Sequence, residues 1–522
     1  MLNRTGYKQG KLVVTTLEQL MPKEHFLRDL DSHVDFTFVY DKVSHLYSNL
    51  GRKSIDPVVL VKMILLGFLY GIDSERKLEQ EVQVNISFRW FLGIDLDEQV
   101  PDHSTISQTR RRKWKDTNVF EDIFAEVVRK CMGAGLVDGS LILTDSTHVK
   151  ANASFDSRKA VTVELEPREY IQKLDALCQQ ADLKIRANAV AEGKKRRGRK
   201  VDETPKTRSI EKSTTDPDCG MFKRPGKPNG FHYLNHQSVD GKSGIITDVF
   251  VTPGNAEDFE SFVDRIKHQQ DKYGFRISEV GIDRGYDREE IHKEMYDFGI
   301  KTYVPLIDTE KMMNSDVYPA KAFQYDSEKD VYVCPNNCEL RYSSVNKCHR
   351  KKIYRASRKD CNKCPLRENC IKGATVKART LEVSFFKEEV DYQRLNYGTH
   401  RYFEVQRKRR IYCEGNFALQ KDNHNLRRTR KRGNASVTEH CLCSALALNL
   451  KRLVKHLKCR KTGCSPLRGY QYFSPINQRG FGNLPNPLSI SLTLSTGPLL
   501  GSFFCYSTVN VIVISQPSQP VG

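Results

Sequence analysis

Apolar residues recur at helical spacing through the first part of the chain, from Leu27 to Trp114. The run IDPVVLVKMILLGFLYGI, residues 55–72, has a proline directly after an aspartate, which is typical of a helix start, and it ends beside a glycine. In PDHSTISQTRRRKW a further helix is expected to begin after Asp102. The pattern therefore predicts an all-helical domain over residues 1–120.

From about residue 136 the pattern becomes that of short strands separated by helices. The apolar run LIL ends in Asp145, and the strand in EVGID ends in Asp283. Between them GFHYLNHQSV and GIITDVFV alternate and are joined by Asp240 and Gly241, which predicts a β-hairpin. Helices are expected over residues 161–191 and 256–270. This order predicts a mixed sheet with helical crossovers, α/β in class.

Composition favours a basic protein with a polyanionic partner. The 522 residues carry a formal net charge of +20, which favours nucleic acid first and an anionic membrane second. The first residues contain no apolar segment typical of a secretory signal, so we expect a cytoplasmic protein. In that compartment the 15 cysteines indicate thiols or a metal site rather than a disulfide framework.

One carboxylate, Glu414, lies in a strongly basic segment. From His400 to Gly433 there are eleven Lys/Arg and three Asp/Glu, yet the pattern is that of an amphipathic helix. Together with Asp145 and Asp283, Glu414 would form a cluster whose members repel one another unless a cation joins them. Oxygen ligands suit Mg²⁺ or Mn²⁺, and two such ions can stabilise in-line displacement at phosphorus. We therefore predict a catalytic metal site.

Cations close to Glu414 are candidates for binding DNA phosphates. Arg410, one helical turn before Glu414, and Lys421, about two turns after it, are expected on the same helix face. A second group is predicted from basic helix ends: Arg427 and Arg428 in LRRTRKRG, and Arg110 and Arg111 near the N-terminal domain's end. The alternative for the latter pair is a charged last turn that complements the helix dipole.

Other acids and histidines near these motifs are interpreted as structural. Asp248 lies mid-strand and is expected to face solvent, whereas Asp287 is expected to cap the next helix. His148 and His232 could reach the site, but a structural role is favoured for both.

A cysteine-rich stretch separates the last strand from the Glu414 helix. The spacing C…C-x2-C-x5-C is typical of a tetrahedral zinc site with a structural role. The predicted ligands are Cys334, Cys361, Cys364 and Cys370. Cys338 and Cys348 are alternative fourth ligands, and the simplest alternative is that all of these are ordinary reduced thiols.

Two stretches differ in composition from the rest of the chain. GKKRRGRK, residues 193–200, is interpreted as a solvated linker. Residues 480–522 contain no charged residue, and their apolar run is interrupted by glycine, proline and serines. We therefore expect no membrane span, poor order and no part in catalysis.

Several motifs together resemble a known family. Asp145 in LTDSTHVKANAS, Asp283 in VGIDRGYD and the spacing R-x3-E-x6-K around Glu414 are similar to the DDE transposases of bacterial insertion sequences with a Y-R-E-K signature. The TPGN motif and the segments LDSHVDFTFVYDKV and PDHSTIS are also similar, and the resemblance covers about residues 25–455. In this sequence the position of the signature tyrosine is occupied by Arg407, which can still bind phosphate, and Tyr412 is out of register.

The resemblance implies an RNase H-like catalytic fold, metal-dependent cleavage at the ends of the element, attack of the freed 3′-OH on target DNA, and a homodimer on DNA. It also supports the four predicted cysteine ligands. The predicted domains are an N-terminal helical DNA-binding domain at 1–120, a catalytic domain at 135–306 and 396–458, and a cysteine-rich insertion at 307–395; the tail at 465–522 matches nothing in the family. The alternatives are a catalytically inactive, zinc-stabilised DNA-binding protein or repressor, and a nuclease that cuts without joining.

Overall fold

The computed structural model describes residues 14–48, 50, 54–115, 117–164, 168–191, 207–224, 229–307, 317–373 and 375–462. The predictions for residues 193–200 and 480–522 fall outside these ranges. Within them, no helix has the length and apolarity needed to cross a lipid bilayer.

The N-terminal region is helical, as predicted. Asp56 accepts a hydrogen bond from the Val58 backbone N–H at 2.7 Å, and Asp102 accepts one from Ser104 at 2.6 Å, so both predicted N-caps are present. The elements are α1 (Leu17–Leu20), α2 (Phe26–His33), α3 (Phe38–Val43), η1 (Ser44–Leu46), α4 (Pro57–Leu69), α5 (Glu75–Val84), α6 (Ile86–Leu92), α7 (His103–Arg112) and α8 (Val119–Gly133). Helix α4 is buried along most of its length because its sequence is apolar on nearly every face.

A mixed sheet follows. Its strands are β1 (Leu141–Lys150), β4 (Gly220–Phe222), β5 (Gly230–Asp240), β6 (Ile246–Pro253), β7 (Glu279–Gly281) and β8 (Lys301–Tyr303). They are arranged in the order β4-β5-β1-β7-β8, with β6 also paired to β5. Strand β5 is antiparallel to β1, whereas β7 is parallel to β1 and β8 to β7. A central strand with an antiparallel hairpin on one side and parallel strands on the other is an RNase H-like arrangement, so the α/β fold class is confirmed.

Three details differ from the sequence-based expectations. Strand β1 does not end at Asp145, because β5 pairs with it as far as Lys150. Residues 161–164 belong to a strand rather than a helix, since their β-branched residues pair in a separate ribbon. The ribbon and neighbouring elements are η2 (Phe155–Ser157), β2 (Arg158–Glu164), β3 (Thr207–Ser213), α9 (Glu169–Ala191) and α10 (Phe262–Tyr273), the last starting later than expected.

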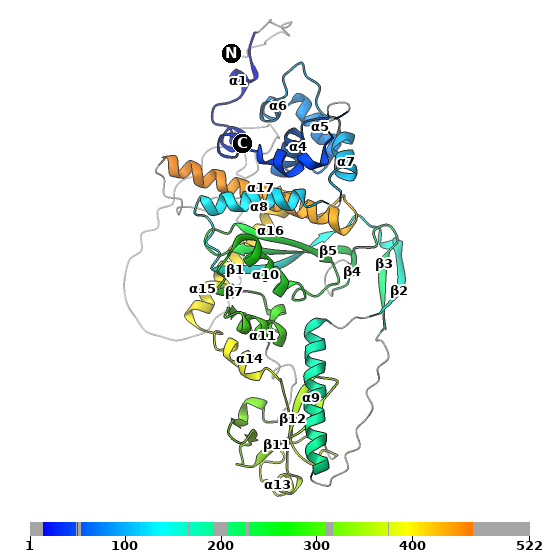
Figure 1. Cartoon of the computed structure of the whole chain (residues 1–522), viewed down its shortest axis with the longest axis vertical. Coiled ribbons are helices and arrows are strands. Elements are labelled where there is room, and N and C mark those ends of the chain that lie inside the picture. The colour runs from blue at the N-terminus through cyan, green and yellow to red at the C-terminus, as the bar shows by residue number, and fades with distance from the viewer. Residues whose placement is uncertain are drawn as a thin grey trace, which may run out of the picture. The chain divides into compact units, whose positions relative to one another are not determined.

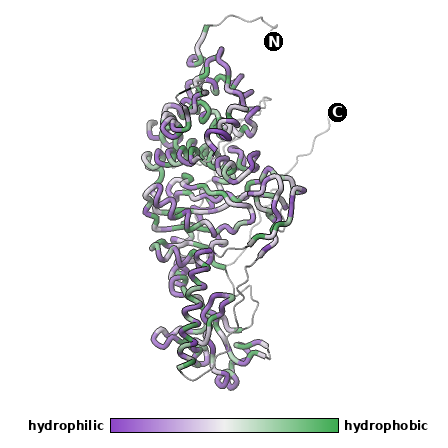
Figure 2. The backbone as a smooth tube through the Cα atoms, turned by 45° about the vertical axis from the view of Figure 1, so that its right-hand side comes forward, coloured by the Kyte–Doolittle hydropathy of each residue, from purple (hydrophilic) through white to green (hydrophobic). Residues whose placement is uncertain are grey.

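The remaining helices cover the sheet. They are η3 (Arg284–Tyr286), α11 (Glu289–Asp297), α14 (Lys387–Arg394), α15 (His400–Arg409), η5 (Arg410–Glu414), α16 (Gly415–Asn423) and α17 (Asn434–Thr462). Helix α17 lies beside α8 and also packs against α4 and β6 (Figure 1). One apolar core continues from the N-terminal helices into the sheet. Figure 2 shows hydrophobic stretches, in green, alternating with hydrophilic ones, in purple, along the backbone.

The cysteine-rich region forms a second, antiparallel sheet in the order β13-β12-β11-β10-β9. Its elements are η4 (Ala320–Ala322), β9 (Gln324–Asp326), β10 (Val331–Val333), β11 (Glu339–Asn346), β12 (Lys351–Ala356), α13 (Arg358–Asn362) and β13 (Thr380–Val383). Its own core is small: Phe323, Tyr332, Leu340, Tyr354, Ala356 and Leu381.

Two buried histidines make the junction of α4 with the C-terminal helices sensitive to acid. His424 Nδ1 lies 2.7 Å from the Phe68 carbonyl oxygen, and His440 Nε2 lies 2.9 Å from that of Asn425. Burial lowers the pKa of both side chains to about 4. The unfolded chain therefore takes up protons first, and stability is lost as the pH falls from the ordinary histidine pKa of about 6.5 towards 4.

At pH 5.5 we expect a loss of about 1 kcal/mol per histidine relative to pH 7.5. Urea unfolding at the two pH values checks this, with His440→Gln as the comparison because glutamine keeps an N–H donor but does not titrate. The variant should lose about 1 kcal/mol less than the wild type; an equal loss in both proteins would contradict the prediction.

Candidate functional site

The first predicted site residue, Asp145, lies in the middle of β1, with its side chain only 17% exposed. One carboxylate oxygen accepts a hydrogen bond from the Ser146 backbone N–H at 2.8 Å, and the other accepts one from Arg409 Nη1 at 2.7 Å. Burial raises the pKa of Asp145 to about 6; nearby Asp283 and Glu414 act in the same direction, and Arg409 acts against it. The Asp145 carboxylate is thus poorly solvated and lies near two further carboxylates.

The other two predicted carboxylates lie near the same guanidinium. Arg409 Nη2 is 3.5 Å from an oxygen of Asp283 and 3.5 Å from an oxygen of Glu414. The Asp283 and Glu414 side chains are 52% and 57% exposed, whereas that of Arg409 is 9% exposed. Three acids from distant parts of the sequence therefore surround one buried cation and open towards solvent on one side.

Strand register explains how the two aspartates come together. In the parallel pair of β1 and β7, Leu143 lies opposite Gly281. Asp145 lies two residues after Leu143, and Asp283 lies two residues after Gly281, so the two aspartates are at the same level of the neighbouring chain segments. Helix α15 approaches these strands closely: a Cβ at Gly281 would lie 2.5 Å from Val405 Cγ1 and 2.8 Å from Leu143 Cδ2.

The helix turn that carries Glu414 is a π-helix, η5. Because a π turn hydrogen-bonds residues five apart, it aligns Arg409 with Glu414, whereas α-helical spacing had favoured Arg410. Arg410 is exposed, as is Arg407, and in the described part of the chain no ion pair joins either residue to the three carboxylates. Arg409 is the residue that sequence reasoning missed, since four consecutive cations at 407–410 gave no signal to distinguish it.

Lys421 lies on the same side of β1 as Asp145. Its Nζ is 2.5 Å from Oγ1 of Thr147, two residues along the strand from Asp145.

A fourth carboxylate near the cluster was not predicted from the sequence. Asp258 accepts a hydrogen bond from Ser146 Oγ at 2.5 Å, and burial raises its pKa.

Two interpretations of nearby acids were wrong. Asp248 does not face solvent but is buried in a two-point ion pair with Arg265. Asp287 does not cap α11; it is buried and accepts hydrogen bonds from His292 and Arg394 and from a backbone N–H. Both errors have the same cause. An aspartate in a strand or before a helix can face solvent or cap the helix, but it can also form a buried ion pair with an arginine that is distant in the sequence.

The two histidines have structural contacts. His148 Nε2 lies 3.2 Å from the Gly254 carbonyl oxygen, and His232 Nδ1 lies 3.1 Å from that of Gly230. Both rings pack against Phe222.

The predicted DNA-binding arginines outside this cluster are not equivalent. Arg110 does not suit a phosphate contact: its side chain is 9% exposed and forms ion pairs with Glu75 and Glu439. This salt bridge ties α7 to α5 and α17. Arg111, Arg427 and Arg428 are exposed, and Arg427 also pairs with Asp422.

Five cysteines face one cavity of the small sheet. Cys338 joins the four predicted ligands in lining it, together with Asp360, Arg367 and Arg379. Cys348 is exposed and does not line this cavity. Of the two alternative ligands, only Cys338 is therefore placed with the others.

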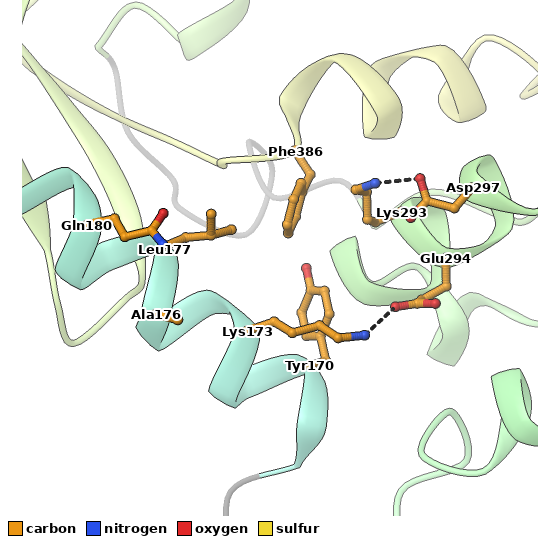
Figure 3. Close-up of a pocket in the computed structure, with 9 residues that line it drawn as sticks. All are labelled: Tyr170, Lys173, Ala176, Leu177, Gln180, Lys293, Glu294, Asp297 and Phe386. Atoms are coloured by element: carbon orange, nitrogen blue, oxygen red, sulfur yellow. Dashed lines mark hydrogen bonds and ion pairs between the residues drawn. The ribbon is translucent and has the colours of Figure 1, made fainter.

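Two further features belong to the scaffold. Among the described residues, the one group of three ligand atoms that all lie within 4.8 Å of one another is Glu79, Asp102 and His103. Glu79 accepts hydrogen bonds from the backbone N–H of His103 at 3.0 Å and its ring Nδ1 at 2.7 Å, so this group joins α5 to α7. A cavity of about 360 Å³ lies between α9, α11 and Phe386, where Lys173 faces Glu294 and Lys293 faces Asp297 (Figure 3). Its charges are paired, and it is lined by none of the three carboxylates.

Comparison with known proteins identifies the class. Residues 15–112 match a family described as a transposase domain (DUF772), and residues 333–454 match one described as a transposase DDE domain. With the mixed sheet and the helical N-terminal region, these matches define a transposase. The chain therefore carries two transposase domains, and together they support a DDE transposase of the insertion-sequence type, as the sequence motifs predicted; the Y-R-E-K form of the signature stays a prediction.

No curated protein matches the chain. Among solved structures, it is similar to a piggyBac transposase in a synaptic complex with hairpin DNA. That similarity has a TM-score of 0.32 at 10% sequence identity and covers 84% of this chain and 74% of the other.

Proposed function

We propose that Asp145, Asp283 and Glu414 bind divalent metal, Mg²⁺ or Mn²⁺, and that the protein cuts DNA at the ends of its element and joins them to target DNA. The observation that carries this proposal is the convergence of the three carboxylates on the Arg409 guanidinium. Such a group needs positive charge to stay together, and its all-oxygen donor set fits these hard cations.

The chemistry is displacement at phosphorus. In cleavage, a water oxygen bonds to phosphorus while the bond to the 3′ oxygen breaks, and that oxygen leaves as a hydroxyl group after gaining a proton. In joining, the 3′-OH loses its proton and its oxygen bonds to a target phosphorus, while the bond from that phosphorus to the target's 3′ oxygen breaks and this oxygen gains a proton. Bound ions of this kind stabilise the charge on the phosphate oxygens.

The chain's own cations would hold the phosphates. Arg409 and Lys421 lie beside Asp145 and Thr147 on one side of β1, where a scissile phosphate would meet two positive groups. Five further arginines are exposed and would contact the DNA backbone: Arg111, Arg407, Arg410, Arg427 and Arg428. By family resemblance, a homodimer would hold both ends.

An assay of end cleavage and joining tests the proposal. Wild-type protein with Mg²⁺ and a duplex carrying the element's end should give both cut and joined products, and a chelator should remove both. Cutting without joining would support a nuclease instead. DNA binding without any cutting would support the repressor alternative.

We also propose that the cysteine cavity binds a structural Zn²⁺ through four of its five thiols. The supporting observation is that these thiols face one cavity beside a small apolar core, which is a setting where bound metal contributes to folding.

Purified protein should therefore contain about one zinc per chain by atomic emission. The double variant Cys361→Ser/Cys364→Ser should lose the zinc and become sensitive to limited proteolysis within residues 317–383. Cys348→Ser is the matched control, since its thiol is exposed and outside the cavity. Equal zinc content in all three proteins would contradict the proposal.

A further inference from the structure

We propose that Arg409 is a built-in counter-ion that keeps divalent metal affinity low until DNA phosphate draws its guanidinium away from the three carboxylates. The proposal rests on the proposed function, because it assumes that Asp145, Asp283 and Glu414 are the metal ligands. It adds a mechanism by which DNA controls metal loading.

The geometry places Arg409 in direct competition with metal. Its Nη1 lies 2.7 Å from Asp145, and its Nη2 lies 3.5 Å from both Asp283 and Glu414. A divalent cation held by the same oxygens would meet a permanent positive charge at a few ångströms, and like charges at that distance repel strongly. In the free protein, Arg409 therefore lowers the affinity of this site for metal.

Gln406 fixes the position of this arginine. Its Oε1 accepts a hydrogen bond from Arg409 Nε at 3.2 Å. Its amide donates to the carbonyl oxygens of Ile282 at 3.0 Å and Tyr303 at 2.7 Å. Ile282 directly precedes Asp283, so Gln406 links the loop of one metal ligand to the base of the guanidinium. Gln406 is thus a positioning residue.

A DNA phosphate offers the guanidinium a competing partner. Arginine binds phosphate through two parallel N–H donors, while its Nε can keep the contact with Gln406. Once Nη1 and Nη2 turn to the phosphate, the three carboxylates lose their counter-ion and bind divalent metal more tightly. Metal loading then depends on DNA, which would restrain unprogrammed cleavage.

Titration with Mn²⁺, with free ion followed by electron paramagnetic resonance, tests this without measuring activity. In the absence of DNA, Arg409→Gln should bind Mn²⁺ at least about fivefold more tightly than the wild type. Lys408→Gln removes a neighbouring charge that pairs with Glu404 instead, and it should match the wild type. Arg409→Lys, which keeps the charge, should also bind weakly.

Adding duplex DNA separates the outcomes further. The wild type should gain Mn²⁺ affinity by a similar factor, whereas Arg409→Gln should change less than about twofold; Asp145→Asn with DNA corrects for ions bound by the duplex. Unchanged wild-type affinity on adding DNA, or weaker binding by Arg409→Gln than by the wild type, would overturn the inference. If Asp145→Asn binds Mn²⁺ as the wild type does, the proposed metal site itself is wrong.

Discussion

Asp145→Asn is expected to reduce both end cleavage and joining by on the order of a thousandfold. Asparagine keeps the size of the side chain but removes the negative charge of the most buried of the three acids. In the proposed mechanism cleavage and joining use the same carboxylates, so the two products should disappear together. A variant that cut normally but failed to join would show that Asp145 has a different role.

The fold of Asp145→Asn should survive, and this separates a catalytic from a structural effect. The folded protein raises the Asp145 pKa to about 6, above its ordinary value, so ionisation of this group costs stability as the pH rises through that range. At pH 7.5 the neutral amide avoids that cost, and the thermal midpoint should be unchanged or higher. Glu260→Gln, at an exposed acid outside the cluster, is the control for charge alone.

Much of the fold could be predicted because it follows from local signals. Helix caps at Asp56 and Asp102 and the turn after Asp240 depend on a few neighbouring residues, and the structure has them. The extension of β1 beyond Asp145 depends instead on pairing with β5, a partner more than eighty residues away. The residues that follow the aspartate, Ser146, Thr147 and His148, are polar and give no local signal of this pairing.

The sequence predicted the three carboxylates of the candidate site but not the arginine, Arg409, that lies among them. In the sequence, Asp145 and Asp283 each come after a short apolar run and Glu414 stands out in a basic helix, so composition and order were sufficient to select them. The position of Arg409 depends on a π turn, which brings residue 409 rather than 410 onto the helix face of Glu414. A turn of five residues is too short to appear as a periodicity in the sequence. The same limit explains Asp248 and Asp287, whose partners Arg265 and Arg394 are recognised only in three dimensions.

The second large effect is expected at a residue without a side chain, Gly281. A methyl group there would lie 2.5 Å from Val405 Cγ1 and 2.8 Å from Leu143 Cδ2, both fully buried. Gly281→Ala should therefore cost about 2 kcal/mol of unfolding free energy, measured in urea, because a packed core has no room for the added volume. Cleavage should fall as well, since α15 carries Arg409 and cannot move from β7 without moving the site.

Val405→Ala tests whether this contact is the cause. By itself it should cost about 2 kcal/mol through the cavity it leaves. In the double variant the methyl at 281 enters the space vacated at 405, so the total loss should stay near about 2 kcal/mol rather than reach the sum. Gly133→Ala, where an added Cβ meets nothing within 4 Å, should be neutral or stabilising. Additive losses in the double variant would mean that Gly281 is required for another reason, and that the close approach of α15 to β7 does not hold the carboxylates and Arg409 in register.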